Sequence, residues 1–195
     1  MTPISRRLFN ALVLGAAALA ATPAFAQSGT PHLLLTLEAG VVDIELLPAI
    51  APKHVERIVT LTERGDYDGV VFHRVIEGFM AQTGDVKFGK SGAADFDLGR
   101  AGMGGSDLPN VQAEFNAESF VRGAVGAARS SDPNSFNAQF FVTTAPSTFL
   151  DGQYTVFGKV VSGMEFVDAL EKGPQSQNGA VANPDKIVSA AIEYR

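Results

Sequence analysis

The sequence has no cysteine and only three histidines among its 195 residues. Without cysteine there can be no disulfide, no thiolate metal site and no catalytic thiol, so the packed core alone must stabilise the fold. The histidines, His32, His54 and His73, do not follow metal-ligand spacings such as H-x-x-x-H, and we expect no metal and no other cofactor. The nucleophile motif G-x-S-x-G of serine hydrolases is also missing.

Basic residues are fewer than acidic ones. The chain has 15 lysines and arginines against 21 acidic residues, which gives a formal net charge of −6 at pH 7. Such a balance disfavours nucleic acids and anionic membranes as partners. The glycine-rich stretch at residues 102–105 neither follows a predicted strand nor opens a predicted helix, so we interpret it as a flexible loop beside a substrate groove and not as a nucleotide site.

The first 26 residues have the pattern of an export signal. Arg6 and Arg7 precede an apolar run at residues 11–21, and the Ala-Phe-Ala triplet at residues 24–26 fits a cleavage site. The run is shorter than the about 20 apolar residues that a membrane anchor needs. Residues 5–9 (S-R-R-L-F) match the twin-arginine signal, which exports folded proteins, while an ordinary Sec signal with two arginines is the alternative. Either route predicts a periplasmic protein that is not held in a membrane after cleavage.

Residues 27–195 are expected to form one domain, because no linker or change in composition divides them, and we expect a monomer. Alternating or continuous runs of apolar residues predict eight strands. They lie at residues 33–37, 41–47, 70–76, 79–82, 124–128, 140–144, 155–161 and 187–193. These patterns alone predict a mostly antiparallel sheet that is closed into a barrel or folded into a sandwich.

Two helices are expected between these strands. The first begins at Pro52, a residue that the first turn of a helix tolerates, and ends at Gly65. The second begins with a capping box formed by Ser162 and Glu165, and Gly173 and the following proline end it. Its buried face is predicted to carry three apolar side chains, Phe166, Val167 and Leu170.

Residues 70–85, VVFHRVIEGFMAQTGD, are the most informative part of the chain. They place Arg74 close to two large apolar side chains, Phe79 and Met80, and to the amide of Gln82. This combination suits a neutral, apolar substrate whose backbone is gripped by hydrogen bonds, as in a prolyl peptide. Together with QFFVT at residues 139–143 and FLDGQYTVFGKV at residues 149–160, the segment closely resembles the cyclophilin family of peptidyl-prolyl isomerases.

The resemblance extends from about residue 33 to residue 195 and implies a fold and an activity. The resemblance implies a closed eight-stranded antiparallel β-barrel capped by two α-helices, so it favours the barrel over the sandwich. It implies a peptidyl-prolyl cis-trans isomerase that needs no cofactor and acts on proline-containing peptides and on unfolded or partly folded proteins. A peptide-binding chaperone with incidental turnover is the alternative, and a hydrolase is disfavoured because no nucleophile and base are visible.

Arg74 matches the catalytic arginine of the family's FHR motif. Rotation about an X-Pro bond breaks no covalent bond, and its barrier of about 18–20 kcal/mol comes from amide resonance. A guanidinium that donates to the proline nitrogen would weaken this resonance, and it stays charged at any working pH.

The remaining site residues follow from the same matching motifs. Four would line the proline pocket, namely Phe79, Met80, Phe141 and Leu150. Others would hold the substrate backbone or brace the arginine, namely Gln82, Ala128, Arg129 and Gln139; at Arg129 the expected contact is chiefly through the main chain. Phe140 and His73 are expected to face away from the pocket as structural residues.

Two rim positions depart from the family pattern. Phe149 stands where many eukaryotic members have tryptophan, and Tyr154 stands where they have histidine. Because the indole N–H is missing, a buried carbonyl of cyclosporin would lose its hydrogen-bond donor. We therefore expect weak cyclosporin binding with the arginine and the apolar pocket retained.

Overall fold

The structure, a computed structural model, describes residues 29–195. The predicted export signal lies outside these residues. The strands are β1 (Pro31–Thr36), β2 (Val41–Leu46), β3 (Arg74–Ile76), β4 (Met80–Thr83), β5 (Ala124–Ala127), β6 (Phe140–Thr143), β7 (Val156–Ser162) and β8 (Ser189–Tyr194). The α-helices are α1 (Pro52–Glu63) and α2 (Met164–Ala169), and the short 3₁₀ helices are η1 (Thr148–Leu150) and η2 (Gln175–Gln177). Within residues 29–195, no helix combines the length and apolarity that crossing a membrane requires.

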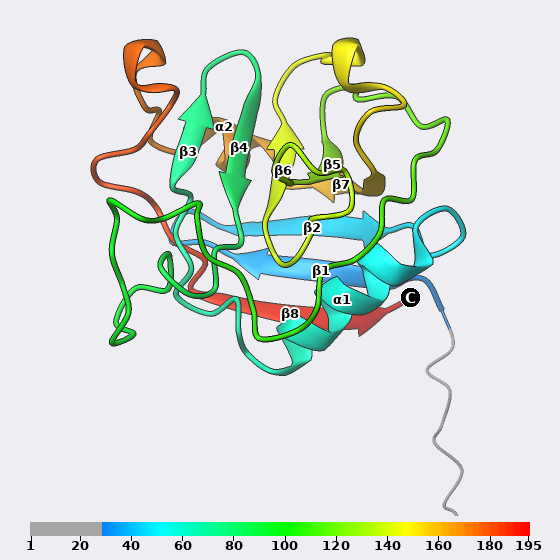
Figure 1. The fold of residues 1–195 in the computed structure, drawn as a ribbon, viewed down its shortest axis with the longest axis horizontal. Helices are drawn as coiled ribbons and strands as arrows, with labels where there is room; N and C mark the ends of the chain where they lie inside the picture. The colour runs from blue at the N-terminus through cyan, green and yellow to red at the C-terminus, as the bar shows by residue number, and fades with distance from the viewer. Residues whose placement is uncertain (1–28) are drawn as a thin grey trace, which may run out of the picture.

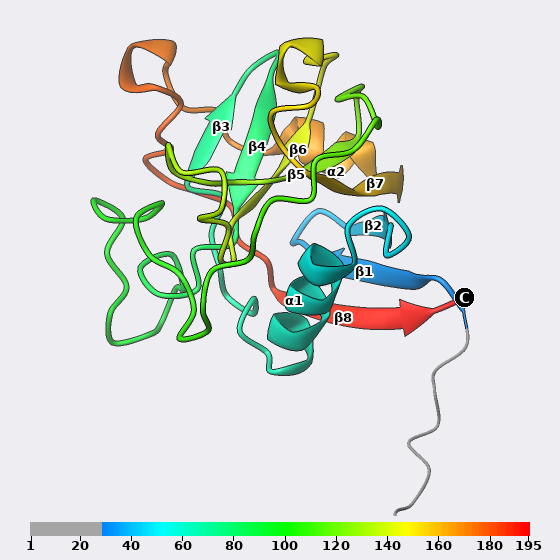
Figure 2. The same cartoon turned by 45° about the vertical axis from the view of Figure 1, so that its right-hand side comes forward.

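The eight strands form one antiparallel sheet in the order β3-β4-β6-β5-β7-β2-β1-β8. Figure 1 shows β8, β1 and β2 crossing below the steeper strands β3, β4 and β6. Figure 2 shows α1 lying against β8, and α2 contacts β2. The expectation of a mostly β fold with eight antiparallel strands and two helices is confirmed.

The expectation of a closed barrel is wrong, because the sheet curls into an open half-barrel. In the described chain no ladder joins the end strands β3 and β8. Instead, the segments that precede them meet in a single bridge between Val71 and Lys186. One hydrogen bond on each side of this bridge holds the edge together. The N–H of Phe72 donates to Asp185 O, and the N–H of Ile187 donates to Val70 O. The predicted strands at residues 70–76 and 187–193 are thus shortened at the ends where closure would have occurred.

Helix α1 begins as predicted, with Pro52 in its first turn. Its exposed N–H groups are capped from a distant loop, since the carboxylate of Glu114 accepts hydrogen bonds from the main-chain N–H of Lys53 (3.1 Å) and of His54 (3.0 Å). Helix α1 has C-cap Arg64, followed by Gly65, whose φ of 70° is readily adopted by glycine.

The predicted capping box of the second helix is wrong. Ser162 is the last residue of β7, where it pairs with Asp43, and Gly163 is the N-cap without any side-chain hydrogen bond. Gly163 has φ 86°, and a Cβ there would collide with the main chain of Val41, so glycine is required at this crossing. The predicted buried face is present, with Val167 and Leu170 in the core and Phe166 partly buried against it.

The core has two parts. The larger part fills the space between the sheet and the helices, and it includes Phe140 and Phe157, both completely buried. The smaller part lies beneath one surface of β4, β5 and β6 and contains Met80, Phe120, Ala124, Phe141, Leu150 and Val156. It supports the surface on which the predicted site residues meet.

Candidate active site

Arg74 is the first residue of β3 and lies opposite Gln82 of β4 in the antiparallel register. Opposite residues in such a pair project from the same face of the sheet, so the two side chains meet. Nη1 of Arg74 donates to Oε1 of Gln82 (3.2 Å). Nε donates to the main-chain oxygen of Asn178 and Nη2 to its Oδ1, both at 2.9 Å. The guanidinium is therefore held on three of its nitrogens.

The electrostatic state of Arg74 follows from its half-buried position. Burial lowers the pKa of Arg74 from its ordinary value, because removing water disfavours the charged form. Arginine nevertheless stays protonated in proteins. The site therefore contains a permanent cation that keeps part of its surface accessible.

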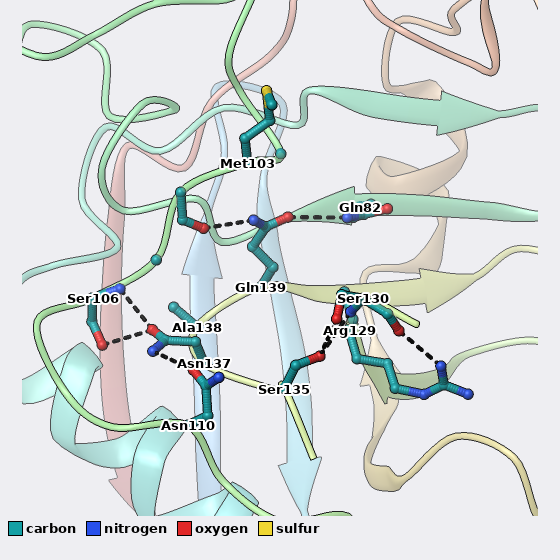
Figure 3. A pocket seen from close by; sticks show the side chains of 14 residues that line it. Gln82, Met103, Ser106, Asn110, Arg129, Ser130, Ser135, Asn137, Ala138 and Gln139 are labelled. Atoms are coloured by element: carbon teal, nitrogen blue, oxygen red, sulfur yellow. Dashed lines mark hydrogen bonds between the residues drawn. The ribbon is translucent and has the colours of Figure 1, made fainter. Parts of the chain in front are cut away.

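A chain of hydrogen bonds continues from Gln82 into the neighbouring loop. Nε2 of Gln82 donates to Oε1 of Gln139 (3.0 Å), as Figure 3 shows. Nε2 of Gln139 in turn donates to the main-chain oxygen of Gly104 (2.7 Å). The amide of Gln82 can therefore offer its oxygen to Arg74 only in one orientation, which fixes the side of the guanidinium that faces β4.

A pocket of about 270 Å³ opens beside this guanidinium. It is lined by Arg74, Phe79, Met80, Gln82, Ala128, Arg129, Phe141, Phe149, Leu150 and Tyr154. These are all the predicted site residues except Gln139, which lines an adjoining depression and reaches the pocket through Gln82. The structure therefore brings together residues from β3, β4, β6, η1 and three connecting loops.

Aromatic packing shapes the apolar wall. The ring of Phe141 stacks on Phe120 (centroids 5.6 Å apart) and meets Tyr154 edge-on at 6.1 Å. Gly126 of β5 makes room for this, because a Cβ there would collide with both phenylalanine rings. Phe149 is 64% exposed and contacts Phe79 with ring centroids 5.4 Å apart. The wall therefore has a fixed floor and one exposed aromatic edge.

Comparison with known proteins places this geometry in a family. Residues 32–192 match the family described as "Cyclophilin type peptidyl-prolyl cis-trans isomerase/CLD". The chain belongs to the cyclophilin family. A "Probable peptidyl-prolyl cis-trans isomerase" of Brucella suis is 58% identical over 161 residues, which are 83% of this chain and 82% of the relative. The "Peptidyl-prolyl cis-trans isomerase A" of Dickeya dadantii is 35% identical over 198 residues, covering 97% of this chain and 98% of the relative.

Solved cyclophilins have the same fold. A cyclophilin from Hirschia baltica superposes with a TM-score of 0.67 at 29% identity, covering 82% of this chain and 73% of the other. A cyclophilin from Cryptosporidium parvum, crystallised in the presence of the dipeptide Ala-Pro, gives 0.70 at 23% identity, with coverage of 84% and 99%. The family match and the two relatives show that this chain is a cyclophilin-type peptidyl-prolyl cis-trans isomerase.

The side chain of Arg129 is more engaged in this cyclophilin than the sequence suggested. Its guanidinium lies 4.1 Å from the ring centroid of Tyr154, a cation–π contact. It also donates to the main-chain oxygens of Ser130 and Gln153, both at 2.9 Å. Arg129 thus holds together two loops at the pocket rim, in addition to any main-chain contact with a substrate.

The two residues predicted to face away from the site are buried. Phe140 is completely buried and meets Tyr67 edge-on with centroids 5.6 Å apart. His73 is 8% exposed and packs beneath the loop at Gly102. Neither lines the cyclophilin pocket.

The sequence analysis missed Asn178, which contacts Arg74 twice. It lies 104 positions further along the chain, in a stretch without strand or helix periodicity. The one local signal is its residue type, since asparagine adopts left-handed backbone conformations more readily than most residues.

Residues 84–91 match the letters of the phosphate-loop pattern G-x-x-x-x-G-K-S, yet the structure gives them another role. Asp85 is completely buried, and its carboxylate accepts the N–H groups of Lys87, Phe88, Gly102 and Gly104 at 2.7–3.0 Å. The chain's own anion thus occupies the place where backbone amides would bind a phosphate. Asp85 thus fastens the loop that contains Gly104, while Lys90 donates to the main-chain oxygens of Gly65 and Asp66.

Proposed function

We propose that this isomerase accelerates X-Pro bond rotation in exported proteins while they fold in the periplasm. The single observation that carries the catalytic part is the guanidinium of Arg74, held by three hydrogen bonds in a pocket with one apolar wall. The pocket accommodates a pyrrolidine ring, and the guanidinium donates to the proline nitrogen as its lone pair localises.

The composition of the pocket supports rotation over hydrolysis. In the described part of the chain, its lining contains no carboxylate, histidine, serine or cysteine. A hydrolase would need a nucleophile with an adjacent base. An isomerase needs neither; it needs only contacts that are stronger in the twisted state than in the planar ones.

The apolar wall supplies binding energy, and Arg74 stabilises the twisted proline over the planar cis and trans forms. Burial of apolar surface contributes about 25 cal/mol per Å², but it does so for cis, trans and twisted prolines alike. A charge-assisted hydrogen bond to the proline nitrogen forms only when resonance is lost, so it lowers the barrier. The ordering of Arg74 favours the enzyme over the alternative of a binding chaperone with incidental turnover, which would not need a fixed cation.

The cellular part of the proposal rests on the signal pattern in residues 1–26. The absence of cysteine is compatible with folding on either side of the inner membrane. Fractionation of cells that express the full chain tests this part: the processed form should appear in the periplasm. An unprocessed cytoplasmic protein would refute the proposed location but would leave the proposed reaction unaffected.

Exchange spectroscopy by NMR tests the reaction itself. An Ala-Pro peptide should show faster cis–trans exchange in the presence of catalytic amounts of protein, with no cleavage product. Line broadening by binding, with exchange rates unchanged, would instead support the chaperone. Appearance of a new amino terminus would support a hydrolase.

A further inference from the structure

Asn178 supplies two of the three hydrogen bonds that hold the guanidinium of Arg74. Its main-chain oxygen accepts from Nε, and its Oδ1 accepts from Nη2, each at 2.9 Å. Gln82 supplies the third, longer bond to Nη1 at 3.2 Å. A guanidinium has five N–H donors, so one N–H on each terminal nitrogen remains free for a substrate. The plane of the fork is defined mainly by Asn178.

The backbone of Asn178 is in an unusual conformation that this contact requires. It has φ 54° and ψ 31°, and it is the one non-glycine residue with positive φ among residues 29–195. In the left-handed region the main-chain and side-chain oxygens of one asparagine can converge on one partner. Most other residues are sterically strained in this region, whereas glycine and asparagine adopt it most readily.

The loop that contains Asn178 is fastened to the strand that contains Arg74. The N–H of Val75 donates to Gly179 O (2.8 Å), and the N–H of Gly173 donates to Val75 O (3.0 Å). Gly173 and Gly179 cross so closely that a Cβ on Gly173 would collide with the main chain of Gly179. Asn178 therefore has a fixed position relative to β3, which is what a residue needs if it is to orient a long, flexible side chain.

We propose that Asn178 is a positioning residue for catalysis, whose side-chain oxygen sets the orientation of the Arg74 guanidinium toward the proline nitrogen. The proposal rests on the proposed role of Arg74. Without Oδ1 of Asn178, the two terminal nitrogens keep only the hydrogen bond to Gln82, and the main-chain bond at Nε does not resist rotation about the Nε–Cζ bond. With Oδ1 of Asn178 in place, rotation about the Nε–Cζ bond breaks two bonds at once.

Asn178→Gly separates positioning from stability. Glycine keeps the left-handed backbone and the main-chain oxygen but removes Oδ1. It adopts positive φ at least as readily as asparagine does. We expect kcat to fall about tenfold, equivalent to about 1.4 kcal/mol, with KM within about twofold and the thermal midpoint unchanged or higher. Ser176→Gly is the matched control, since it loosens the same exposed loop without removing a contact to Arg74, and its kcat should be unchanged.

A double-mutant cycle identifies the route of the effect. In an Arg74→Ala background, Asn178→Gly should cost nothing further, because the side chain that it positions is gone. The same tenfold loss in both backgrounds would overturn the proposal, as would an unchanged kcat in Asn178→Gly alone. A fall in activity that follows a fall in stability, shared with Ser176→Gly, would show a purely structural loop.

NMR of the arginine side chain tests the positioning directly. Rotation about the Nε–Cζ bond of Arg74 should be slow in the unmodified protein and in Asn178→Asp, which retains an acceptor, and fast in Asn178→Gly. Equal rates in all three would contradict the proposal. If rotation responds as expected while Arg74→Ala keeps full activity, the contact stands and the proposed role of Arg74 in catalysis is what fails.

Discussion

His73 gives this protein a specific dependence of stability on pH. Its side chain is 8% exposed, and burial lowers the pKa of His73 from the ordinary 6.5 to about 4, against the opposing effect of the nearby Asp85 carboxylate. The positive charge of Arg74 acts in the same direction as burial. The folded protein therefore keeps His73 neutral at pH values where the unfolded chain protonates it.

The sign and size of the effect follow from these two pKa values. Between pH 6.5 and 4 the unfolded state binds the proton and the folded state does not, so stability falls as pH falls. The gap of about 2.5 between the pKa values corresponds to about 3 kcal/mol, at about 1.4 kcal/mol per pH unit. This is a large share of the about 5–15 kcal/mol by which a domain is stable. Above pH 6.5 the contribution is fully present.

Urea unfolding of the protein and of His73→Gln at a series of pH values measures this contribution. Glutamine does not titrate, so the variant should lose about 3 kcal/mol less than the unmodified protein between about pH 7.5 and 4. Burial also lowers the pKa of His54. His54 and the carboxylates titrate in both proteins, so their contributions cancel in the comparison. Parallel curves for the two proteins would refute the assignment of the effect to His73.

Two further predictions concern the pocket rim and the export signal. Phe149→Trp adds an indole N–H at an exposed aromatic edge. It should tighten cyclosporin inhibition by roughly 5- to 150-fold with little change in turnover. Nanomolar inhibition of the unmodified protein, or no gain in the variant, would contradict this. Replacement of both Arg6 and Arg7 by lysine keeps the positive charge and should block export by the twin-arginine route; normal maturation of the double variant in the periplasm would indicate Sec.

The sequence predicted most of the pocket because its residues lie in three short motifs. Arg74, Met80 and Gln82 fall on two strands joined by a tight turn, so their alternation alone places them together. The contact with Asn178 could not be predicted this way. It depends on a left-handed residue in an irregular loop, and nothing in the local pattern indicates where that loop returns to β3.

The two corrections to the fold have a common cause. Ser162 and Glu165 have the spacing of a capping box, but pairing of β7 with β2 extends through Ser162 and takes it out of the helix. Likewise, residues 70–73 have the composition of a strand, yet Val70 and Val71 donate to the main-chain oxygens of Tyr67 and Gly89, which leaves a single bridge to the segment before β8. In both places competition between neighbouring elements for the same backbone groups decided the outcome, and local patterns do not record that competition.

The most direct test of the central claim is the kcat/KM of Arg74→Ala for a proline peptide. We predict a loss of two orders of magnitude or more, about 2.7 kcal/mol, in a protein that remains folded. Arg74→Lys should recover little of it, because an ammonium lacks the planar fork. Arg122→Ala, which removes a surface arginine paired with Asp168, should leave kcat/KM unchanged. Full activity in folded Arg74→Ala would contradict the proposal that this guanidinium lowers the barrier to X-Pro rotation.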